Sequence, residues 1–335
     1  MEKVLDFCGS DGIILPLQQS SITLPAAGSG AKRVEKEFMN QKKYAVFTMD
    51  VETFADTECI QNVGYPVDLD LMDGFDEYIR ILDRYGIKST LFTLGNLASP
   101  FTERLKAHLA NGHRLALHNY DHIAPMSVSV EQFRENLLRA KERMRKLFNV
   151  DVAGFRAPCF SMDRARLDVL QELGFRYDSS HLNFLSARHT VDLDLQDYQP
   201  LRPGIFRNQN FYEFGLSNAR LGHSSFPVSG GGYVRIVPWP AIKMLLRQYI
   251  RNHDYYVFYL HPFELTRKKV PLIKGLKGYD QYYIRQGIRS YGKRIERIIR
   301  MLQKHGYEFV TFEQLMQNLD TEAPASNECI KKEAC

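Results

Sequence analysis

Apolar and polar residues follow two different periods along the chain from Tyr44 onward. Short apolar runs such as YAVFTM have the length of buried strands, whereas longer segments place apolar residues at i, i+3 and i+4 and end near glycine, as amphipathic helices do. YAVFTM is followed by the helical pattern DLMDGFDEYIRILDRYG, which ends at Gly86, and then by the strand-like KSTLFTLG. The same alternation recurs in FTERLKAHLANG and RLALH, in VEQFRENLLRAKERMRKLF and VAGFRAP, and in RARLDVLQELG and FRYDSS.

This alternation predicts an α/β fold with a parallel sheet, because each helix returns the chain to the same edge of the sheet. The later strand-like segments YVFYLH and YEFVTF continue the series and indicate a closed or nearly closed barrel. Residues from about 183 to 256 interrupt the rhythm as an insertion, in which the three glycines of FPVSGGGYVRIVPW favour a tight turn or a backbone close to a ligand. We expect a poorly ordered leader over 1–42, a single barrel over 43–320 and a tail over 321–335.

Composition narrows the class of protein. The chain has 335 residues, 44% hydrophobic and 25% charged, as in ordinary soluble domains. Its five cysteines are scattered and form no CxxC pair, so the sequence indicates neither a disulfide framework nor a zinc ribbon, and a reducing compartment fits best. No apolar run reaches the roughly 18 residues of a membrane span, and the N-terminal GIILPL is too short for a secretion signal. We therefore expect a cytoplasmic protein.

The formal charge of +5 is unevenly placed, because the segment from Arg267 to Lys304 is rich in lysine and arginine and has only two acids, Asp280 and Glu296. Its later part, IRQGIRSYGKRIERIIRML, spaces apolar residues as one buried helix face and leaves the cations outside. A solvated basic face gives this pattern, and so does a surface for an anionic partner. Among such partners we expect an anionic membrane at its inner face rather than a nucleic acid.

Reactive side chains stand at the ends of the predicted strands. Asp50 and Glu52 occupy alternate positions, so they point the same way. Catalytic groups gather at the carboxyl ends of barrel strands, and we therefore expect the strand-end residues to meet. Later strands lead into His118 and His122, Arg156, Asp178 and His261.

Each signal also has a plainer explanation when it is taken alone. Two acids at alternate positions fit a strand that leaves the core, and an HxxxH pair often occurs by chance. Arg156 fits a surface ion pair, Asp178 fits a turn cap, and His261 fits a hydrogen-bonded core histidine. Alternatively, the imidazoles of His118 and His122, four residues apart on a helical turn, can bind one metal ion. A carboxylate of Asp50 or Glu52 would then be the third ligand, with an open coordination position for water. The shared topological position of these residues favours the metal site.

In order along the chain, the motifs FTMDVE, HNYDH, RAPCFS, YDSS and YLHP resemble those of the polysaccharide deacetylase family, also called the NodB-like or carbohydrate esterase family 4 hydrolases. The similarity spans roughly residues 44 to 315, and GGGYVRIVPW followed by YLHPFEL is similar to the branch found with bacterial exopolysaccharide and surface-glycan biosynthesis. The resemblance implies a distorted (β/α) barrel with a divalent metal, most often zinc and otherwise cobalt, nickel or manganese. It implies hydrolysis of N-acetyl groups on amino sugars, in a glycan or in a lipid-linked or nucleotide-linked precursor, and not of peptide bonds.

The resemblance also implies a role for each matching residue. Asp50 would be the catalytic base, with Arg156 to orient it, and His261 would be the general acid. Asp178 would tune a histidine. The implied metal ligands are Glu52, His118 and His122, and the implied substrate contacts are Cys159, through its backbone N–H, Phe160, Tyr233 and Trp239.

Three departures from the family pattern stand out. Asp-Val-Glu replaces two adjacent aspartates, so Glu52 must reach the metal from a position two residues after Asp50. Cys159 replaces an aromatic residue. The only tryptophan of the chain is Trp239, in the glycine-rich insertion. A deformylase or other amidase on the same barrel is one alternative. A catalytically silent carbohydrate-binding protein is another, although such a protein has no need of acid, base and ligands together.

Overall fold

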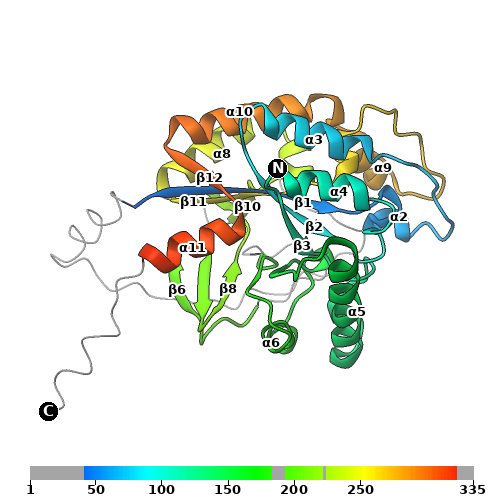
Figure 1. The fold of residues 1–335 in the computed structure, drawn as a ribbon. Coiled ribbons are helices and arrows are strands. Elements are labelled where there is room, and N and C mark those ends of the chain that lie inside the picture. The colour runs from blue at the N-terminus through cyan, green and yellow to red at the C-terminus, as the bar shows by residue number, and fades with distance from the viewer. Residues whose placement is uncertain (1–40, 183–192, 222–223, 323–335) are drawn as a thin grey trace, which may run out of the picture.

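The computed structural model describes residues 41–182, 193–221 and 224–322. All but the last two residues of the expected leader and all but the first two of the expected tail lie outside these ranges. The described chain forms one large sheet with helices on both sides (Figure 1). No helix of this part of the chain is long and apolar enough to cross a bilayer.

The central sheet has ten strands, in the order β11-β1-β2-β3-β4-β5-β8-β7-β6, with β12 paired to the first half of β1. The pairs from β11 to β8 are parallel, as the alternation of elements predicted, while β6, β7 and β8 are antiparallel neighbours. The strands are β1 (Lys43–Val51), β2 (Ser89–Thr93), β3 (Arg114–Leu117), β4 (Gly154–Phe155), β5 (Tyr177–Asp178), β6 (Gln199–Arg202), β7 (Ile205–Asn208), β8 (Phe211–Phe214), β11 (Tyr255–Phe258) and β12 (Tyr307–Val310). A separate hairpin joins β9 (Asn218–Leu221) to β10 (Ser224–Pro227).

The helices lie on opposite sides of the sheet, with α3, α8 and α10 on one side and α5 and α6 on the other (Figure 1). Local signals set their ends: the Ser129 hydroxyl accepts from the Gln132 N–H at the start of α5, and Asn149 closes that helix in a left-handed conformation. The main helices are α3 (Asp73–Asp83), α4 (Thr102–Ala110), α5 (Val130–Phe148), α6 (Arg164–Glu172), α8 (Trp239–Asn252), α10 (Ile288–Lys304) and α11 (Phe312–Glu322). Shorter ones are α2 (Glu58–Gln61), α7 (Gly231–Ile236), α9 (Gly278–Arg285) and the 3₁₀ turns η1 (Phe54–Asp56), η2 (Pro125–Ser127), η3 (Pro158–Phe160) and η4 (Pro262–Leu265).

The alternation of side chains along β1 decides which residues face the inside of the curled sheet. Tyr44 and Val46 belong to a buried cluster that also contains side chains of β2, β5, β8, β11 and α11, so the sheet curls around this cluster. Phe47 and Met49 belong to a second cluster with α3, α8 and α10 on the outside. Because the row of Tyr44 and Val46 continues at every second position, Asp50 falls on the inner side of the sheet.

The sheet curls strongly but does not close by backbone hydrogen bonds, because β6 and β11 remain its two ends. Side chains bridge the gap: the Arg202 guanidinium donates to the Lys42 carbonyl at 2.7 Å and lies 3.1 Å from the Asp254 carboxylate. The Ser217 hydroxyl accepts from the Val257 N–H at 2.9 Å. The architecture is therefore an α/β half-barrel, a distorted form of the barrel that the sequence predicted.

The segment expected as an insertion contributes to this half-barrel. Its described residues form β6, β7 and β8 of the main sheet, the β9/β10 hairpin, and helices α7 and α8. The glycine-rich part leads into α7, and α8 then packs on the outer side of β11.

Candidate active site

The carboxyl ends of the parallel strands border a cavity of about 360 Å³. Most of the residues singled out in the sequence line it: Asp50, Glu52, His118, His122, Cys159, Phe160, Tyr233 and His261. Its walls also include residues not expected there, among them Tyr259, Tyr279, Tyr283 and Lys277. Strand-end residues from distant parts of the chain therefore meet in one place.

Glu52, His118 and His122 form a buried triad on one side of the cavity. The Glu52 Oε2 atom lies 2.9 Å from His122 Nε2 and 3.6 Å from His118 Nε2. One potential ligand atom of each residue lies within 4.8 Å of the other two. Two imidazoles and a carboxylate are a common ligand set for zinc and related divalent metals, so the chemistry of the triad fits a cation.

Two further observations agree with a cation site. The buried Glu52 Oε2 atom has only the two imidazoles as polar neighbours, so a cation held between these three side chains would satisfy it. His118 Nδ1 lies 2.8 Å from the Arg156 carbonyl oxygen, which can only accept. Nδ1 therefore carries the proton, and the lone pair of Nε2 points toward Glu52, as in histidines whose second nitrogen binds a metal.

The electrostatics of the triad favour an ionised carboxylate. Burial alone would raise the pKa of the Glu52 carboxyl, but the neighbouring His122 and His261 hold that pKa well below its usual range. Burial would lower the pKa of the His122 imidazole, and Glu52 raises it instead. The triad is thus built to hold positive charge, as a proton or as a cation.

Arg156 fixes Asp50 from behind the cavity. The fully buried guanidinium donates to Asp50 Oδ1 at 2.8 Å and to the Thr48 hydroxyl at 2.8 Å. It also donates to the carbonyl and the hydroxyl of Ser179, both at 3.0 Å, and its Cζ atom lies 4.1 Å from the centre of the Phe92 ring. These contacts lock one arginine rotamer, so Asp50 is held through Oδ1 while Oδ2 faces His261 Nε2 at 4.0 Å.

His261 follows β11 and is held by two buried residues that the sequence did not indicate. Glu264 Oε2 accepts from the His261 backbone N–H at 3.0 Å and lies 3.3 Å from His261 Nδ1. Glu264 Oε1 accepts from Arg235 Nε at 2.9 Å, and both of these side chains are fully buried. Burial would lower the pKa of His261, but Glu52, Glu264 and Asp50 raise it to about 9.

The signal for Glu264 was its position three residues after a strand-end histidine, where a glutamate can accept from the backbone of that histidine. Arg235 had no comparable signal, because its partner follows it by 29 positions and is known only from the fold.

The glycine-rich segment packs directly against the chain beyond β11. Gly230 has φ of 127°, and a Cβ atom there would lie 2.0 Å from the Tyr259 carbonyl oxygen. A Cβ on Gly232 would lie 2.2 Å from the Tyr283 ring. Only glycine allows this approach, which brings Gly232 and Tyr233 into the cavity wall.

Cys159 and Phe160 form another part of the wall, in a turn after β4. Both have positive φ, 55° and 53°, which is unusual for residues with side chains. The Phe160 ring meets the Tyr259 ring edge to face, with centroids 5.3 Å apart. The role of the Cys159 N–H as an oxyanion donor stays a prediction.

Three of the residues singled out in the sequence, Arg156, Asp178 and Trp239, do not line the cavity. Asp178 alternates with the inward-facing Tyr177, so its carboxylate lies on the opposite side of the sheet, where it accepts from Ser180 and faces Glu213. The carboxylate beside His261 is that of Glu264 instead. Trp239 begins α8 on the outside, because the chain leaves the cavity wall after α7, and its ring lies 5.4 Å from the Arg297 guanidinium.

Comparisons with known proteins cover both halves of the chain. A sequence model of the polysaccharide deacetylase family matches residues 63–177, and a domain of unknown function, DUF3473, matches residues 196–317. The peptidoglycan deacetylase of Helicobacter pylori is 26% identical over 107 residues, which cover 32% of this chain and 36% of the relative. The peptidoglycan deacetylase-like protein FGM2 of Gibberella zeae is 30% identical over 131 residues, which cover 37% of this chain and 39% of the relative.

The chain therefore spans well under half the length of these two curated relatives. A crystal structure from Mycobacterium smegmatis, described as a polysaccharide deacetylase, superimposes with a TM-score of 0.54 at 16% identity. That superposition covers 84% of this chain and 92% of the other, and it shows the same fold. Residues 63–177 therefore match the polysaccharide deacetylase family by sequence, and the chain shares the fold of that crystal structure.

Proposed function

We propose that the protein is a metal-dependent N-deacetylase that removes acetyl groups from amino sugars of a surface glycan or of its precursor. The observation that carries this proposal is the meeting of the Glu52, His118 and His122 triad with Asp50 and His261 in one cavity. The match of residues 63–177 to the polysaccharide deacetylase family supports an acetylated glycan as the substrate class. A cytoplasmic location stays a prediction that rests on the cysteine pattern.

Glu52, His118 and His122 would hold the divalent cation, for which we propose zinc because two imidazoles and one carboxylate leave coordination positions open. When bound, the cation supplies Lewis acidity, which polarises an amide carbonyl and lowers the pKa of water.

Asp50 and His261 would divide the proton transfers. Asp50, fixed through Oδ1 by Arg156, would use Oδ2 to accept a proton as water attacks the acetyl carbon. His261, whose ring Glu264 holds through Nδ1, would donate from Nε2 to the amine nitrogen as the C–N bond breaks. Acetate and the free amine leave, and each transfer of this kind contributes roughly 10²- to 10⁴-fold in rate.

Other groups would orient the substrate. The Cys159 N–H is our candidate donor to the developing oxyanion, a contact worth about 3 kcal/mol in related chemistry. Glu264 would keep the His261 ring in position, since it binds both the backbone N–H and Nδ1. The aromatic rings of Phe160, Tyr233 and Tyr259 offer flat apolar surfaces for a sugar ring, in a cavity of about 360 Å³ that suits a small ligand.

The test is acyl release by the metal-loaded full chain on a panel of lipid-linked and nucleotide-linked N-acetyl amino sugars, each with its N-formyl counterpart. We expect acetate from at least one substrate and release at least a hundredfold slower from the Asp50→Asn variant. Release of formate alone would replace the proposal by a deformylase. Sugar binding by a metal-loaded protein that releases neither acid would support the silent binding protein instead.

A further inference from the structure

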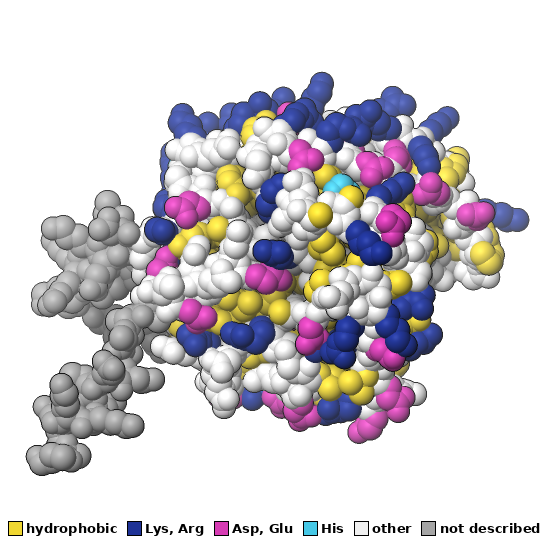
Figure 2. Space-filling model, viewed as in Figure 1, with side chains coloured by type: hydrophobic (Ala, Val, Ile, Leu, Met, Phe, Trp, Pro, Cys, Tyr) yellow, Lys and Arg dark blue, Asp and Glu magenta, His cyan; other side chains and the backbone are white. Residues whose placement is uncertain are grey.

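Helices α8 and α10 present a basic surface on the outside of the half-barrel. Their apolar sides pack in one buried cluster over β1 and β11, and the cations lie on the opposite sides. Helix α8 contains no aspartate or glutamate at all. Figure 2 shows lysine and arginine side chains projecting along the upper edge, over α10. The basic face, as we call it, consists of Lys243, Arg247 and Arg251 of α8 and Arg289, Lys293, Arg297, Arg300 and Lys304 of α10.

The charges of the basic face are largely uncompensated. Only Arg300 has a carboxylate partner, Glu296 at 3.6 Å, and Glu296 is shared with Arg84 at 2.8 Å. Within the described ranges, the other seven cations have no carboxylate within 4.0 Å, and all except Lys243 are exposed. On other surfaces arginines such as Arg134 are paired with acids. The basic face therefore has a positive potential that attracts anionic partners.

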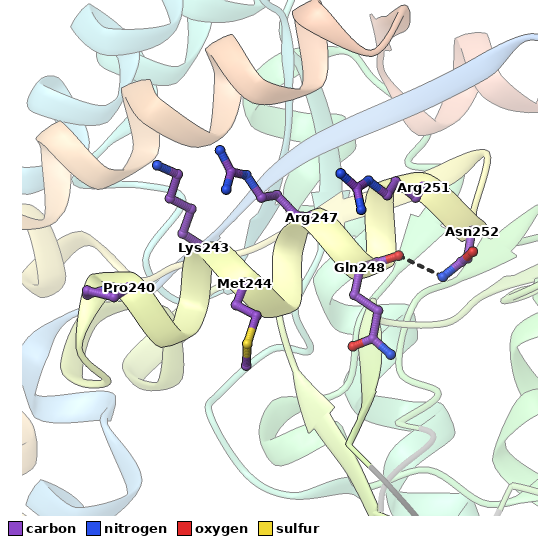
Figure 3. Close-up of a pocket in the computed structure, with 7 residues that line it drawn as sticks. All are labelled: Pro240, Lys243, Met244, Arg247, Gln248, Arg251 and Asn252. Atoms are coloured by element: carbon purple, nitrogen blue, oxygen red, sulfur yellow. Dashed lines mark hydrogen bonds between the residues drawn. The ribbon is translucent and has the colours of Figure 1, made fainter.

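Apolar side chains lie among these cations. A shallow groove between the two helices is lined by Trp239 and Met301 together with Lys243, Arg297 and Arg300. A second hollow runs along α8, where Lys243, Arg247 and Arg251 leave the helix on one side and Met244 on the other (Figure 3). The Met244 side chain is 59% exposed. Cations around tryptophan and other apolar side chains are typical of surfaces that bind at the interface of a bilayer.

We propose that the basic face docks on the surface of an anionic lipid bilayer. The charge of this face is complementary to anionic headgroups, and the exposed Met244 is placed to reach the boundary between headgroups and acyl chains. Trp239, half-buried in the groove, would lie at the level of the headgroups. A nucleic acid fits less well, because Arg297 already covers the Trp239 ring on which a base would stack, and the exposed Met244 would have no partner.

Docking would set the orientation of the cavity. The short α7 leads from Gly232 and Tyr233 in the cavity wall to Trp239 at the start of α8. Arg294 of α10 ties this connection in place, because it donates to the Val234 and Val237 carbonyls at 2.8 and 2.6 Å. The docked surface and the cavity wall are therefore joined directly through the short helix α7.

Trp239 makes this proposal directly measurable, since it is the only tryptophan of the chain. The full-length protein is titrated with vesicles of phosphatidylcholine alone or of phosphatidylcholine mixed with phosphatidylglycerol. We expect a blue shift of the Trp239 emission, and quenching by lipids with brominated acyl chains, only with phosphatidylglycerol and at low salt. A bound polyanion that is not a bilayer cannot give quenching by acyl chains.

A triple substitution tests the charges without touching the Trp239 contact. Lys243→Gln, Arg247→Gln and Lys293→Gln together should weaken vesicle binding on the order of a hundredfold, because each cation near such a surface contributes about one factor of five. The matched control replaces Arg134, Arg145 and Lys146 of α5, on the opposite side of the sheet, by glutamine and should bind as the wild type does. Melting temperatures verify that both variants fold.

Three results would overturn the proposal. They are no binding to phosphatidylglycerol vesicles at low salt, equal loss of binding in both triple variants, and binding to duplex DNA as tight as to the vesicles.

Discussion

At the end of β1, two carboxylates two residues apart have different surroundings. Asp50 Oδ1 is bound by a buried arginine, whereas Glu52 Oε2 faces the Nε2 atoms of His118 and His122. An arginine already occupies one oxygen of Asp50, which leaves that residue a proton acceptor. The contacts of Glu52 are those of a metal ligand.

Substitution should separate these two roles. His118→Ala should lose both bound metal and acetate release, because one of three ligands is gone. Asp50→Asn should retain the metal and lose roughly 10²- to 10⁴-fold in kcat, because only the base is removed. Metal content after dialysis, measured by elemental mass spectrometry, is compared with initial rates. His108→Ala, a histidine of α4 outside the cavity lining, serves as the control and should change neither. Loss of metal from Asp50→Asn would reassign Asp50 as a ligand.

The strand-end rule predicted most of the cavity at the level of single residues. It selected His118, His122 and His261 because every parallel strand delivers its last residues to the same edge. It also selected Asp178, which the alternation along β5 turns to the other side of the sheet. The contact between Arg235 and Glu264 could not be predicted from the sequence, because the two residues are 29 positions apart and only the fold brings them together.

At the scale of elements, β5 and β8 place two acids directly opposite each other. Asp178 and Glu213 are register partners in a parallel pair, and both side chains are fully buried. Burial raises the pKa of Asp178 to about 6, and burial together with the Asp178 charge raises that of Glu213 well above its usual range. The folded state therefore holds at least one proton between them that the unfolded state releases.

This pair should make stability depend on pH. A pKa raised on folding stabilises the protein at low pH, and for Asp178 this stabilisation is lost as pH rises from 3.8, its ordinary pKa, to about 6. Glu213→Gln removes one acid and supplies an amide donor for Asp178, so the variant should gain up to about 3 kcal/mol in free energy of unfolding at about pH 8. Little gain is expected at about pH 4. Urea melts at both pH values measure this, with the exposed Glu103→Gln as control. Equal gains at both pH values would contradict the shared proton.

Hydrophobic periodicity predicted the long elements well. The apolar face of the basic helix is confirmed, since Ile288, Tyr291, Ile295, Ile298 and Leu302 are buried. The helical pattern starts at Ile284, but α10 begins only at Ile288. Gly287, with φ of 80°, separates α10 from α9. Strands β6 and β7 escaped notice because QPLR and IFRN are four residues long, and neither alternates cleanly between apolar and polar positions.

On the scale of the whole molecule, Arg202 connects the two ends of the open sheet. Arg202 is the last residue of β6. Its guanidinium binds the Lys42 carbonyl just before β1, the Asp254 carboxylate just before β11 and the Glu322 carboxylate at the end of α11. Burial raises the pKa of Asp254, and Arg202 opposes this rise. These contacts replace the backbone pairing that would close a barrel.

Arg202→Ala should therefore lower the free energy of unfolding by about 3 kcal/mol, because it leaves a buried carboxylate without its counter-charge. Thermal or urea unfolding measures the loss. Arg207→Ala is the matched control, since its ion pair with Asp320 is more exposed and should be worth less than about 1 kcal/mol. Equal effects of the two substitutions would show that Arg202 does not hold the ends together.

The order of strands predicted a barrel but could not predict whether it closes. Closure depends on whether the last strands pair with each other, and strand count and spacing in the sequence do not contain that information. The antiparallel turn of β6 and β7 at one end, and the bridge by Arg202, are visible only in the fold.

The position of β1 also bears on how the chain acquires this structure as it leaves the ribosome. Strand β1 is made early, yet Tyr44 pairs with Tyr255 on one side and Glu308 on the other. Only its second half finds an early neighbour, β2. Strand β1, which is buried at every residue after Lys43, must therefore wait for nearly the whole described chain, with its edges open meanwhile. The inner cluster can therefore be sealed only after β11 and β12 have been made, because both pair with the first half of β1.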